Sequence, residues 1–196
     1  MLGTVTERAG NSGLLCDLGS GVEPSFVADL WGRRRIAVDI VPGPSVDVVA
    51  DGQALPFRDK SVDVILLMEV LEHVADPLRV LRECSRIIRP GGHLCLTAPQ
   101  YHITHDHPGD FYRYTRQGLT YLCREAKLRV LDAWATGGAV LVLFHAIELN
   151  LSPKTRVAFV ALTYRVFDWL DRRACGHGNR KGSRDAVGWA VVAVRE

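Results

Sequence analysis

The chain has 196 residues, a length that suits one domain with a hydrophobic core of its own. Hydrophobic residues make up 47% and charged residues 23% of the sequence, as in an ordinary globular protein. The formal net charge is only +2, so the chain lacks the strongly basic balance of nucleic-acid-binding domains. We therefore expect no nucleic acid partner.

The cysteines and the N-terminal residues indicate the compartment. The five cysteines are widely spaced and include no C-x-x-C pair, which argues against both a disulfide framework and a zinc site. Residues 1–13 contain no apolar run of the secretory kind. No apolar stretch reaches the ~20 residues that a membrane-spanning helix needs. We therefore predict a cytoplasmic protein.

In the first half of the chain, apolar runs alternate with helix-like segments, which is typical of a parallel sheet with crossover helices. Two helices are expected, Pro24–Trp31 and Pro77–Arg89, the second with a proline in its first turn and apolar residues at helical spacing. The strands expected in this half are Leu14–Leu18, Arg35–Asp39, Val46–Ala50, Val62–Met68 and His93–Ala98.

The second half is less regular. Thr115 is expected to cap a helix that runs to about Ala126, followed by a strand at Leu128–Ala135. The last strand is expected at Ala186–Val194. About fifty residues separate these two strands, far more than a hairpin needs. They contain two apolar stretches, followed by a polar loop rich in glycine and basic residues: Val140–Leu151, Val157–Leu170 and Gly176–Ser183.

A glycine turn, Gly19-Ser20-Gly21, directly follows the first expected strand. Such a turn at a helix start lets backbone N–H groups approach a ligand closely, although a plain structural turn would look the same. Asp39 ends the second expected strand about 20 positions later, where a carboxylate can accept hydrogen bonds from both ribose hydroxyls. A helix cap or a solvated turn would also explain that aspartate. The pair predicts a nucleotide-binding site.

Two residues bear on which nucleotide binds. Pro24 stands where the dinucleotide fingerprint needs glycine or alanine. Asp17, just before the glycines, would repel a pyrophosphate but suits an ammonium group. These residues favour S-adenosylmethionine over NAD.

The ordered motifs resemble those of class I S-adenosylmethionine-dependent methyltransferases, and the match covers about residues 14–98. The resemblance implies an α/β fold, a Rossmann-like three-layer sandwich with a mainly parallel seven-stranded sheet, an antiparallel last strand and a helical insertion at about 140–173 before it. We expect one domain over 1–196, with a cofactor-binding half at 14–98 and an acceptor-side half at 99–196. The motifs are Asp17-x-Gly19-x-Gly21, Asp39, Ala50–Phe57, Ser61–Ile65, Glu69–Val74 and Leu81 followed by Arg86–Gly92.

The resemblance also implies a role for each matching residue. The turn would line the methionine part of the cofactor, Asp39 would hold the ribose, and Glu69 would lie beneath the sulfonium. Glu23 replaces a glycine that the family often has, so the first helix is expected to begin differently. The implied cofactor-binding residues are Asp17, Gly19 and Gly21 for methionine, Asp39 for ribose, Ile40, Asp51, Gly52, Gln53 and Ala54 around adenine, and Glu69.

Titratable side chains are concentrated after the strand expected at His93–Ala98. Residues 99–115 contain three histidines, two aspartates and three tyrosines. A histidine with a near-neutral pKa can deprotonate a hydroxyl, so we predict His105 or His107 as the catalytic base. The alternative is that Asp106, Asp110 and Arg113 only fix the loop through polar contacts.

A divalent metal is a second hypothesis. Glu69, Glu72 and His73 have the i, i+3, i+4 spacing that shares one face of a helix, and such groups can hold Mg²⁺ or Mn²⁺. The pattern is similar to one that holds metal in ubiquinone-type O-methyltransferases and small-RNA 2′-O-methyltransferases, where a later histidine completes the site. Relatives without metal have a similar sequence, so the metal is left open and is not favoured.

The insertion has two interpretations. Its apolar stretches are too short to span a bilayer, but their aromatic and basic residues suit a helical pair at an acidic membrane surface. The alternative, which we favour, is a lid over the substrate or a dimer face. The sequence does not indicate the oligomeric state.

We expect transfer of a methyl group to a small-molecule acceptor, most simply a hydroxyl. The N/D-P-P-Y/F motif of nucleobase amino methyltransferases does not follow the strand at Val62–Met68. Residues 105–115 resemble H-x-x-P-x-D-[FY]-x-R-Y-T loops of bacterial sugar, cell-envelope and natural-product methyltransferases. The alternatives are a non-catalytic S-adenosylmethionine-binding module of the same fold and, more distantly, an NAD-dependent dehydrogenase.

Overall fold

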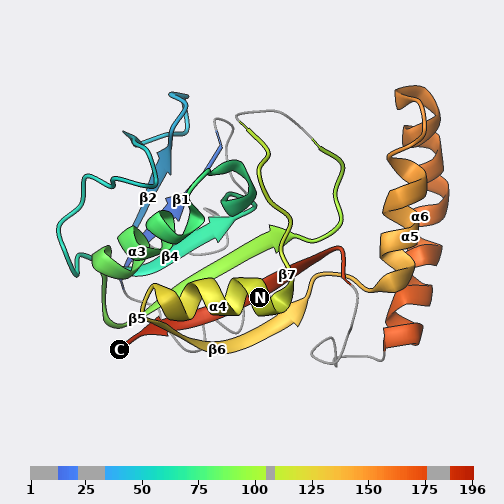
Figure 1. The fold of residues 1–196 in the computed structure, drawn as a ribbon. Coiled ribbons are helices and arrows are strands. Elements are labelled where there is room, and N and C mark those ends of the chain that lie inside the picture. The colour runs from blue at the N-terminus through green and yellow to red at the C-terminus, as the bar shows by residue number, and fades with distance from the viewer. Residues whose placement is uncertain (1–12, 22–33, 105–108, 176–185) are drawn as a thin grey trace.

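The computed structural model describes residues 13–21, 34–104, 109–175 and 186–196. Seven strands form one sheet in the order β3-β2-β1-β4-β5-β7-β6 (Figure 1). Strands β1 to β5 run parallel to one another, and β7 runs antiparallel to both β5 and β6. The predicted Rossmann-like sheet with an antiparallel last strand is therefore confirmed. The strands are β1 Leu14–Leu18, β2 Arg34–Asp39, β3 Val48–Val49, β4 Val62–Met68, β5 Ile88–Pro99, β6 Leu128–Ala135 and β7 Gly188–Arg195.

Helices α3 and α4 cover one face of the sheet (Figure 1). Each begins where a side chain caps it: Asp76 accepts a hydrogen bond from the Arg79 N–H at 3.0 Å, and Thr115 accepts one from the Gly118 N–H at 3.1 Å. The helix predicted at Pro24–Trp31 lies outside the described residues. The described helices are η1 Leu71–His73 (3₁₀), α3 Pro77–Ile87, α4 Arg116–Glu125, α5 Ala139–Glu148 and α6 Pro153–Cys175.

The buried strand residues form two hydrophobic clusters, because successive side chains of a strand point to opposite faces of the sheet. Cys16 and Leu18 of β1 belong to the larger cluster, which includes buried residues of α3 and α4. Leu15 belongs to the smaller cluster, with Val64 and Val192 of β4 and β7. The sheet is thus apolar on both faces, as expected of a central parallel sheet.

Several element boundaries differ from the sequence-based expectation, and two of these differences have a visible cause. Helix α3 ends at Ile87 rather than Arg89, because Pro90 disfavours helical backbone in the residue before it, and β5 then begins at Ile88. Strand β3 has two residues rather than the expected five. The Asp47 carboxylate accepts a hydrogen bond from the Ala37 N–H of β2 at 2.8 Å, so a side chain replaces a ladder contact just before β3.

The insertion between β6 and β7 is a pair of helices, α5 and α6, that stands to one side of the sheet (Figure 1). Phe144 of α5 is buried and stacks on Phe159 of α6 with ring centroids 5.4 Å apart. Asp171 of α6 is fully buried and accepts hydrogen bonds from the first N–H groups of α5, the nearest at 2.9 Å from Gly138. Within the described ranges, no helix combines the length and hydropathy needed to cross a membrane.

Candidate functional site

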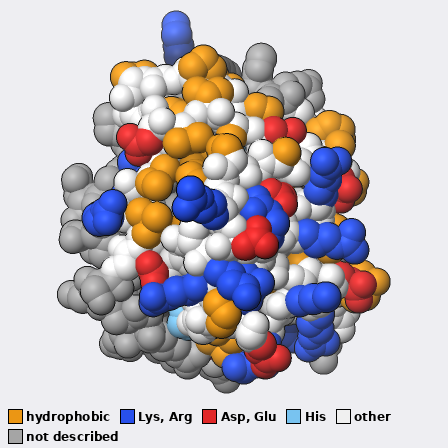
Figure 2. All heavy atoms as spheres, turned by 90° about the vertical axis from the view of Figure 1, so that its left-hand side faces the viewer, with side chains coloured by type: hydrophobic (Ala, Val, Ile, Leu, Met, Phe, Trp, Pro, Cys, Tyr) orange, Lys and Arg blue, Asp and Glu red, His pale blue; other side chains and the backbone are white. Residues whose placement is uncertain are grey.

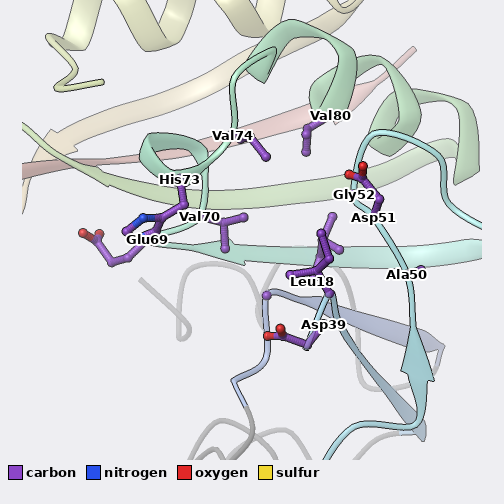
Figure 3. Close-up of a pocket in the computed structure, with 12 residues that line it drawn as sticks. Leu18, Asp39, Ala50, Asp51, Gly52, Glu69, Val70, His73, Val74 and Val80 are labelled. Atoms are coloured by element: carbon purple, nitrogen blue, oxygen red, sulfur yellow. The ribbon is translucent and has the colours of Figure 1, made fainter. Parts of the chain in front are cut away.

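A pocket of about 160 Å³ lies at the carboxyl ends of β1, β2 and β4 (Figure 3). This edge is where ligands bind in open α/β sheets. The pocket walls combine apolar side chains with three carboxylates, those of Asp39, Asp51 and Glu69. Six of the ten predicted cofactor-binding residues line it: Gly19, Asp39, Ile40, Asp51, Gly52 and Glu69.

The glycine turn takes a backbone conformation that favours glycine. Gly19 and Gly21 both have φ of 74°. A Cβ atom on Gly19 would lie 2.2 Å from Cγ2 of Val70, so no larger residue fits without displacing that side chain. The Gly19 N–H donates to the Val38 carbonyl at 2.8 Å, and the Gly21 N–H donates to Oδ2 of Asp39 at 2.9 Å. The turn is therefore fastened to the end of β2.

Asp51 closes a tight turn of its own. Its Oδ1 accepts a hydrogen bond from the Gln53 N–H at 2.8 Å. The side chain of Arg79 holds the same turn from α3 through the Gln53 carbonyl at 3.1 Å. Gln53 and Ala54, predicted to contact adenine through the backbone, belong to this turn but do not line the pocket, and neither does Gly21.

Asp17 lies on the sheet face opposite Leu18, which lines the pocket. It is 4% exposed, and its Oδ2 accepts hydrogen bonds from Nη2 and Nε of Arg35 at 2.9 and 3.1 Å. The sequence analysis did not single out Arg35. In the parallel register Arg35 is level with Leu15, two residues before Asp17, so both side chains share one face of neighbouring strands.

Glu69 leaves β4 with unusual backbone geometry. Its φ is 54°, in the left-handed region that few non-glycine residues adopt, and its N–H donates to the Thr97 carbonyl of β5 at 3.1 Å. Such backbone is often found at functional sites. In Figure 3 the Glu69 and His73 side chains lie side by side at one end of the pocket.

His73 and Glu72 form a partly buried pair behind Glu69. Nδ1 of His73 hydrogen-bonds the Gly109 carbonyl, an acceptor, so Nδ1 carries the proton and Nε2 is the acceptor nitrogen of the neutral ring. Nε2 lies 3.8 Å from Oε1 of Glu72. Glu72 is 1% exposed, and its burial raises the pKa of the carboxyl to about 7. Oε2 of Glu72 has no hydrogen-bond partner within the described part of the chain.

The geometry bears on the metal hypothesis. Glu69 lies before η1, which starts at Leu71, so Glu69, Glu72 and His73 do not share one face of a helical turn. Among residues 13–21, 34–104, 109–175 and 186–196, no group of three or more potential ligands is arranged to hold a metal.

The loop after β5 is fastened by Arg113. Its Nη2 donates to Oδ2 of Asp110 at 2.8 Å and to the Ile103 carbonyl at 2.9 Å, and its Nε donates to the His102 carbonyl at 3.2 Å. The predicted polar fastening is therefore present for Asp110 and Arg113. Asp106 and both predicted catalytic bases, His105 and His107, lie outside the described residues.

A second pocket, of about 220 Å³, opens between this loop and α5. Its lining mixes apolar and uncharged polar side chains. From the sequence we expected an acceptor-side half at 99–196, but we proposed no acceptor-binding role for the residues that line this pocket. A helical spacing was visible, because the α5 residues of the lining recur at i, i+3, i+4 and i+7. The lining is Gln100, Tyr101, His102 and Ile103 from the loop, and Val142, His145, Ala146, Leu149 and Asn150 from the insertion.

Comparison with known proteins agrees with this geometry. Residues 16–96 match a family model described as a methyltransferase domain, and the matched segment contains the glycine turn, Asp39, Asp51 and Glu69. The resemblance to class I S-adenosylmethionine-dependent methyltransferases is thereby confirmed.

Curated relatives match part of the chain. An uncharacterized methyltransferase of Mycobacterium sp. (strain JLS) is 39% identical over 100 residues, which is 44% of this chain and 39% of that protein. The ubiquinone biosynthesis O-methyltransferase of Parvibaculum lavamentivorans is 52% identical over 40 residues, 20% of this chain and 16% of that protein. The chain thus spans well under half the length of these relatives.

Solved structures share the methyltransferase fold over nearly the whole chain. The geranyl diphosphate C-methyltransferase of Streptomyces coelicolor superposes with a TM-score of 0.64 at 15% identity, covering 100% of this chain and 78% of that one. The cyclase SpnF superposes with a TM-score of 0.62 at 20% identity, covering 98% and 78%. At these identities the likeness concerns the fold alone, and the similarity in sequence rests on the match over residues 16–96.

Proposed function

We propose that the protein transfers a methyl group from S-adenosylmethionine to a small-molecule acceptor. The observation that carries this is the pocket beside the glycine turn, where Asp39 and Asp51 lie at opposite walls with apolar side chains between them. These groups suit a nucleoside, because carboxylates accept hydrogen bonds from the ribose hydroxyls and the exocyclic amine, and apolar walls contact the flat base. The cofactor supplies a methyl group activated by the sulfonium to which it is bonded.

Each pocket residue has a role that fits its geometry. Asp39 already accepts N–H groups from Gly21 and Val41, which hold its carboxylate at the pocket while leaving lone pairs for the ribose. Ile40 is 55% exposed in the absence of a ligand, and an adenine ring would cover it. Glu69 would lie near the sulfonium.

The Asp17–Arg35 pair also suits this cofactor. The methionine end of the cofactor carries an ammonium and a carboxylate. Asp17 carries a charge opposite to the ammonium, and Arg35 carries one opposite to the carboxylate. We propose that Asp17 orients the ammonium, as the family resemblance implies, and that Arg35 holds the Asp17 carboxylate in place.

The acceptor is proposed to occupy the second pocket. Glu69 and Thr97 are hydrogen-bonded, so the two pockets flank the ends of adjacent strands, β4 and β5. No lysine, arginine, aspartate or glutamate belongs to the described lining of the second pocket, which favours an uncharged acceptor. We propose a hydroxyl on a neutral molecule with an apolar body, which Val142 and Leu149 would contact.

The transfer is a direct displacement, so the protein must mainly align the acceptor and remove its proton. His105 and His107 remain our proposed bases. His73 is a third candidate, because the Gly109 carbonyl fixes its tautomer with Nε2 as the acceptor nitrogen and its ring lies beside Glu69.

Calorimetric titration with S-adenosylhomocysteine tests the cofactor assignment. We expect saturable binding, and we expect Asp39→Asn to weaken it by about 10- to 100-fold, since a hydrogen bond to a charged group contributes about 1.5–3 kcal/mol. Glu125→Gln on α4 is the matched control, an exposed carboxylate outside the pocket, and should bind like the wild type. Preferential binding of NAD, or equal affinities for the two variants, would refute the assignment.

The competing function is a non-catalytic module that binds the same cofactor. The similarity in fold to SpnF, which is named as a cyclase, is the reason to keep this second hypothesis. It indicates that the fold also occurs in a protein named for a reaction other than methyl transfer. The enzyme and the non-catalytic module are distinguished by incubating the protein and S-adenosylmethionine with a panel of neutral alcohols, phenols and sugars, and measuring the release of S-adenosylhomocysteine. Tight cofactor binding without turnover on any acceptor would favour the module.

A further inference from the structure

The helix pair α5–α6 concentrates exposed apolar side chains. Eight of the sixteen large hydrophobic residues found exposed in the described residues belong to it. Single exposed apolar residues are ordinary on protein surfaces, but clustered ones mark an interaction surface. The eight are Leu143, Ile147, Val157, Leu162, Tyr164, Val166, Trp169 and Leu170.

The surface of α6 turned away from α5 is the best defined part of this cluster. Leu162, Val166 and Trp169 recur at i, i+4 and i+7, and are 80%, 54% and 52% exposed. Phe159 and Phe167 contact Phe144 of α5 and are less exposed than this row. We call the exposed row Leu162, Val166 and Trp169, together with the basic residues described next, the outer stripe.

Basic side chains interleave with this row. Arg165 and Arg173 are exposed between and beyond the apolar residues, and the Arg173 guanidinium lies 4.7 Å from the centre of the Trp169 ring. Lys154 and Arg172 are exposed toward the two ends of the helix. Asp168, also on α6, pairs with Arg172 at 2.8 Å.

The charge decides among possible occupants. A second copy docked through the same stripe would bring like charges together, which is unfavourable in a surface that must lose water. By contrast, the face shown in Figure 2 mixes basic and acidic side chains. The outer stripe therefore fits an anionic partner that also accepts apolar and aromatic groups.

We propose that the outer stripe docks on an anionic lipid surface, with α6 lying in the plane of the membrane interface. Leu162, Val166 and Trp169 would enter the boundary between headgroups and acyl chains, while the basic side chains reach the lipid phosphates. At 1.5 Å per residue, the 23 residues of α6 extend about 35 Å along such a surface. This inference is independent of methyl transfer.

Co-sedimentation of the full chain with sucrose-loaded vesicles tests the proposal. One set of vesicles is phosphatidylcholine alone, and the other is phosphatidylcholine mixed with phosphatidylglycerol. We expect sedimentation with the mixed vesicles, weakened by added salt because the attraction is partly electrostatic. Equal sedimentation with both sets, or none with either, would overturn the proposal.

Paired variants distinguish membrane binding through the outer stripe from nonspecific adsorption to vesicles. Arg165→Glu with Arg173→Glu should lower the partition coefficient about tenfold or more, since each basic residue near an anionic surface contributes about 1 kcal/mol. Leu162→Ser with Trp169→Ser should lower it on the same vesicles. Matched changes on α4, Arg124→Glu with Tyr121→Ser, should leave it within about twofold of the wild type.

Light scattering after size exclusion completes the test. We expect the wild type and the Leu162→Ser, Trp169→Ser variant to have the same mass without vesicles. A concentration-dependent dimer that this variant dissociates would assign the stripe to a second copy and overturn the lipid proposal. Circular dichroism that matches the wild type ensures that each variant is folded.

Discussion

Replacing Gly19 by alanine tests how closely the backbone of the glycine turn approaches β4. The added Cβ atom would lie 2.2 Å from Cγ2 of Val70, well inside van der Waals contact. Gly21 provides a control, because it has the same φ of 74° but no described atom lies within 4 Å of its Cβ position. Backbone strain is therefore common to both substitutions, and steric crowding is specific to one.

The magnitudes follow from these two contributions. Left-handed backbone costs an alanine about 1–2 kcal/mol, so Gly21→Ala should lower the unfolding free energy by that amount. Overpacking adds about 1–3 kcal/mol, so Gly19→Ala should lose about 2–5 kcal/mol in total. Urea unfolding measures both values. Titration with S-adenosylhomocysteine should show the larger loss of affinity in Gly19→Ala.

A double-mutant cycle locates the crowding. Val70→Ala removes the methyl group that the new Cβ would meet, so Gly19→Ala combined with Val70→Ala should recover about 1–3 kcal/mol relative to additivity. Equal stabilities for Gly19→Ala and Gly21→Ala, or an additive double variant, would refute the close approach as the reason for glycine at this position.

Three further predictions concern other parts of the chain. Burial raises the pKa of Glu72 from 4.5 to about 7, so the stabilisation that this carboxyl contributes is complete below about pH 4.5 and is lost as the pH rises through 7. The free energy of unfolding should therefore fall by up to about 3 kcal/mol over that window, and Glu72→Gln should make it depend less on pH. The same pH dependence in the variant and the wild type would contradict the raised pKa. Asp171→Ala removes the acceptor of three backbone N–H groups, so it should speed proteolysis within α5–α6 while amide hydrogen exchange in the sheet stays slow. Asp171→Asn should be cleaved at an intermediate rate, and unchanged cleavage of Asp171→Ala would argue against the cap. Arg113→Lys should speed hydrogen exchange at Tyr101–Ile103, because lysine cannot bridge the Asp110 carboxylate and two carbonyls at once; exchange as slow as in the wild type would show that other contacts hold the loop.

Much of the fold could be predicted because local signals agreed with the tertiary structure. The bounds of β1, β4 and β6 match the apolar runs from which they were predicted, since these strands are bounded by glycine or polar residues. The length of strand β3 was overestimated. The Asp47 side chain accepts a hydrogen bond from the Ala37 N–H of β2, and the hydrophobic pattern of the sequence cannot reveal such a contact. Helices α5 and α6 were expected as a helical insertion at about 140–173, but their exact bounds could not be predicted, because the start of α5 depends on its contacts with Asp171 of α6.

The candidate site divides in the same way. The common location of Gly19, Asp39, Asp51 and Glu69 could be predicted from sequence, because each ends or closely follows a strand of a parallel sheet and those ends meet at one edge. The Asp17–Arg35 pair required the register of two strands, which composition does not reveal. The second pocket forms where residues 100–103 meet α5, some forty positions later in the chain, so no local motif describes it.

The position of β7 has a consequence for how the sheet assembles. This strand lies between β5 and β6, although it follows both in the chain. Until it is in place, β5 and β6 each present an unpaired edge, and the final insertion forms two antiparallel ladders at once. These are contacts of long sequence separation, which form slowly. Strand β7 must therefore emerge from the ribosome before this side of the sheet can close, and until then the open edges are available to chaperones or to other chains.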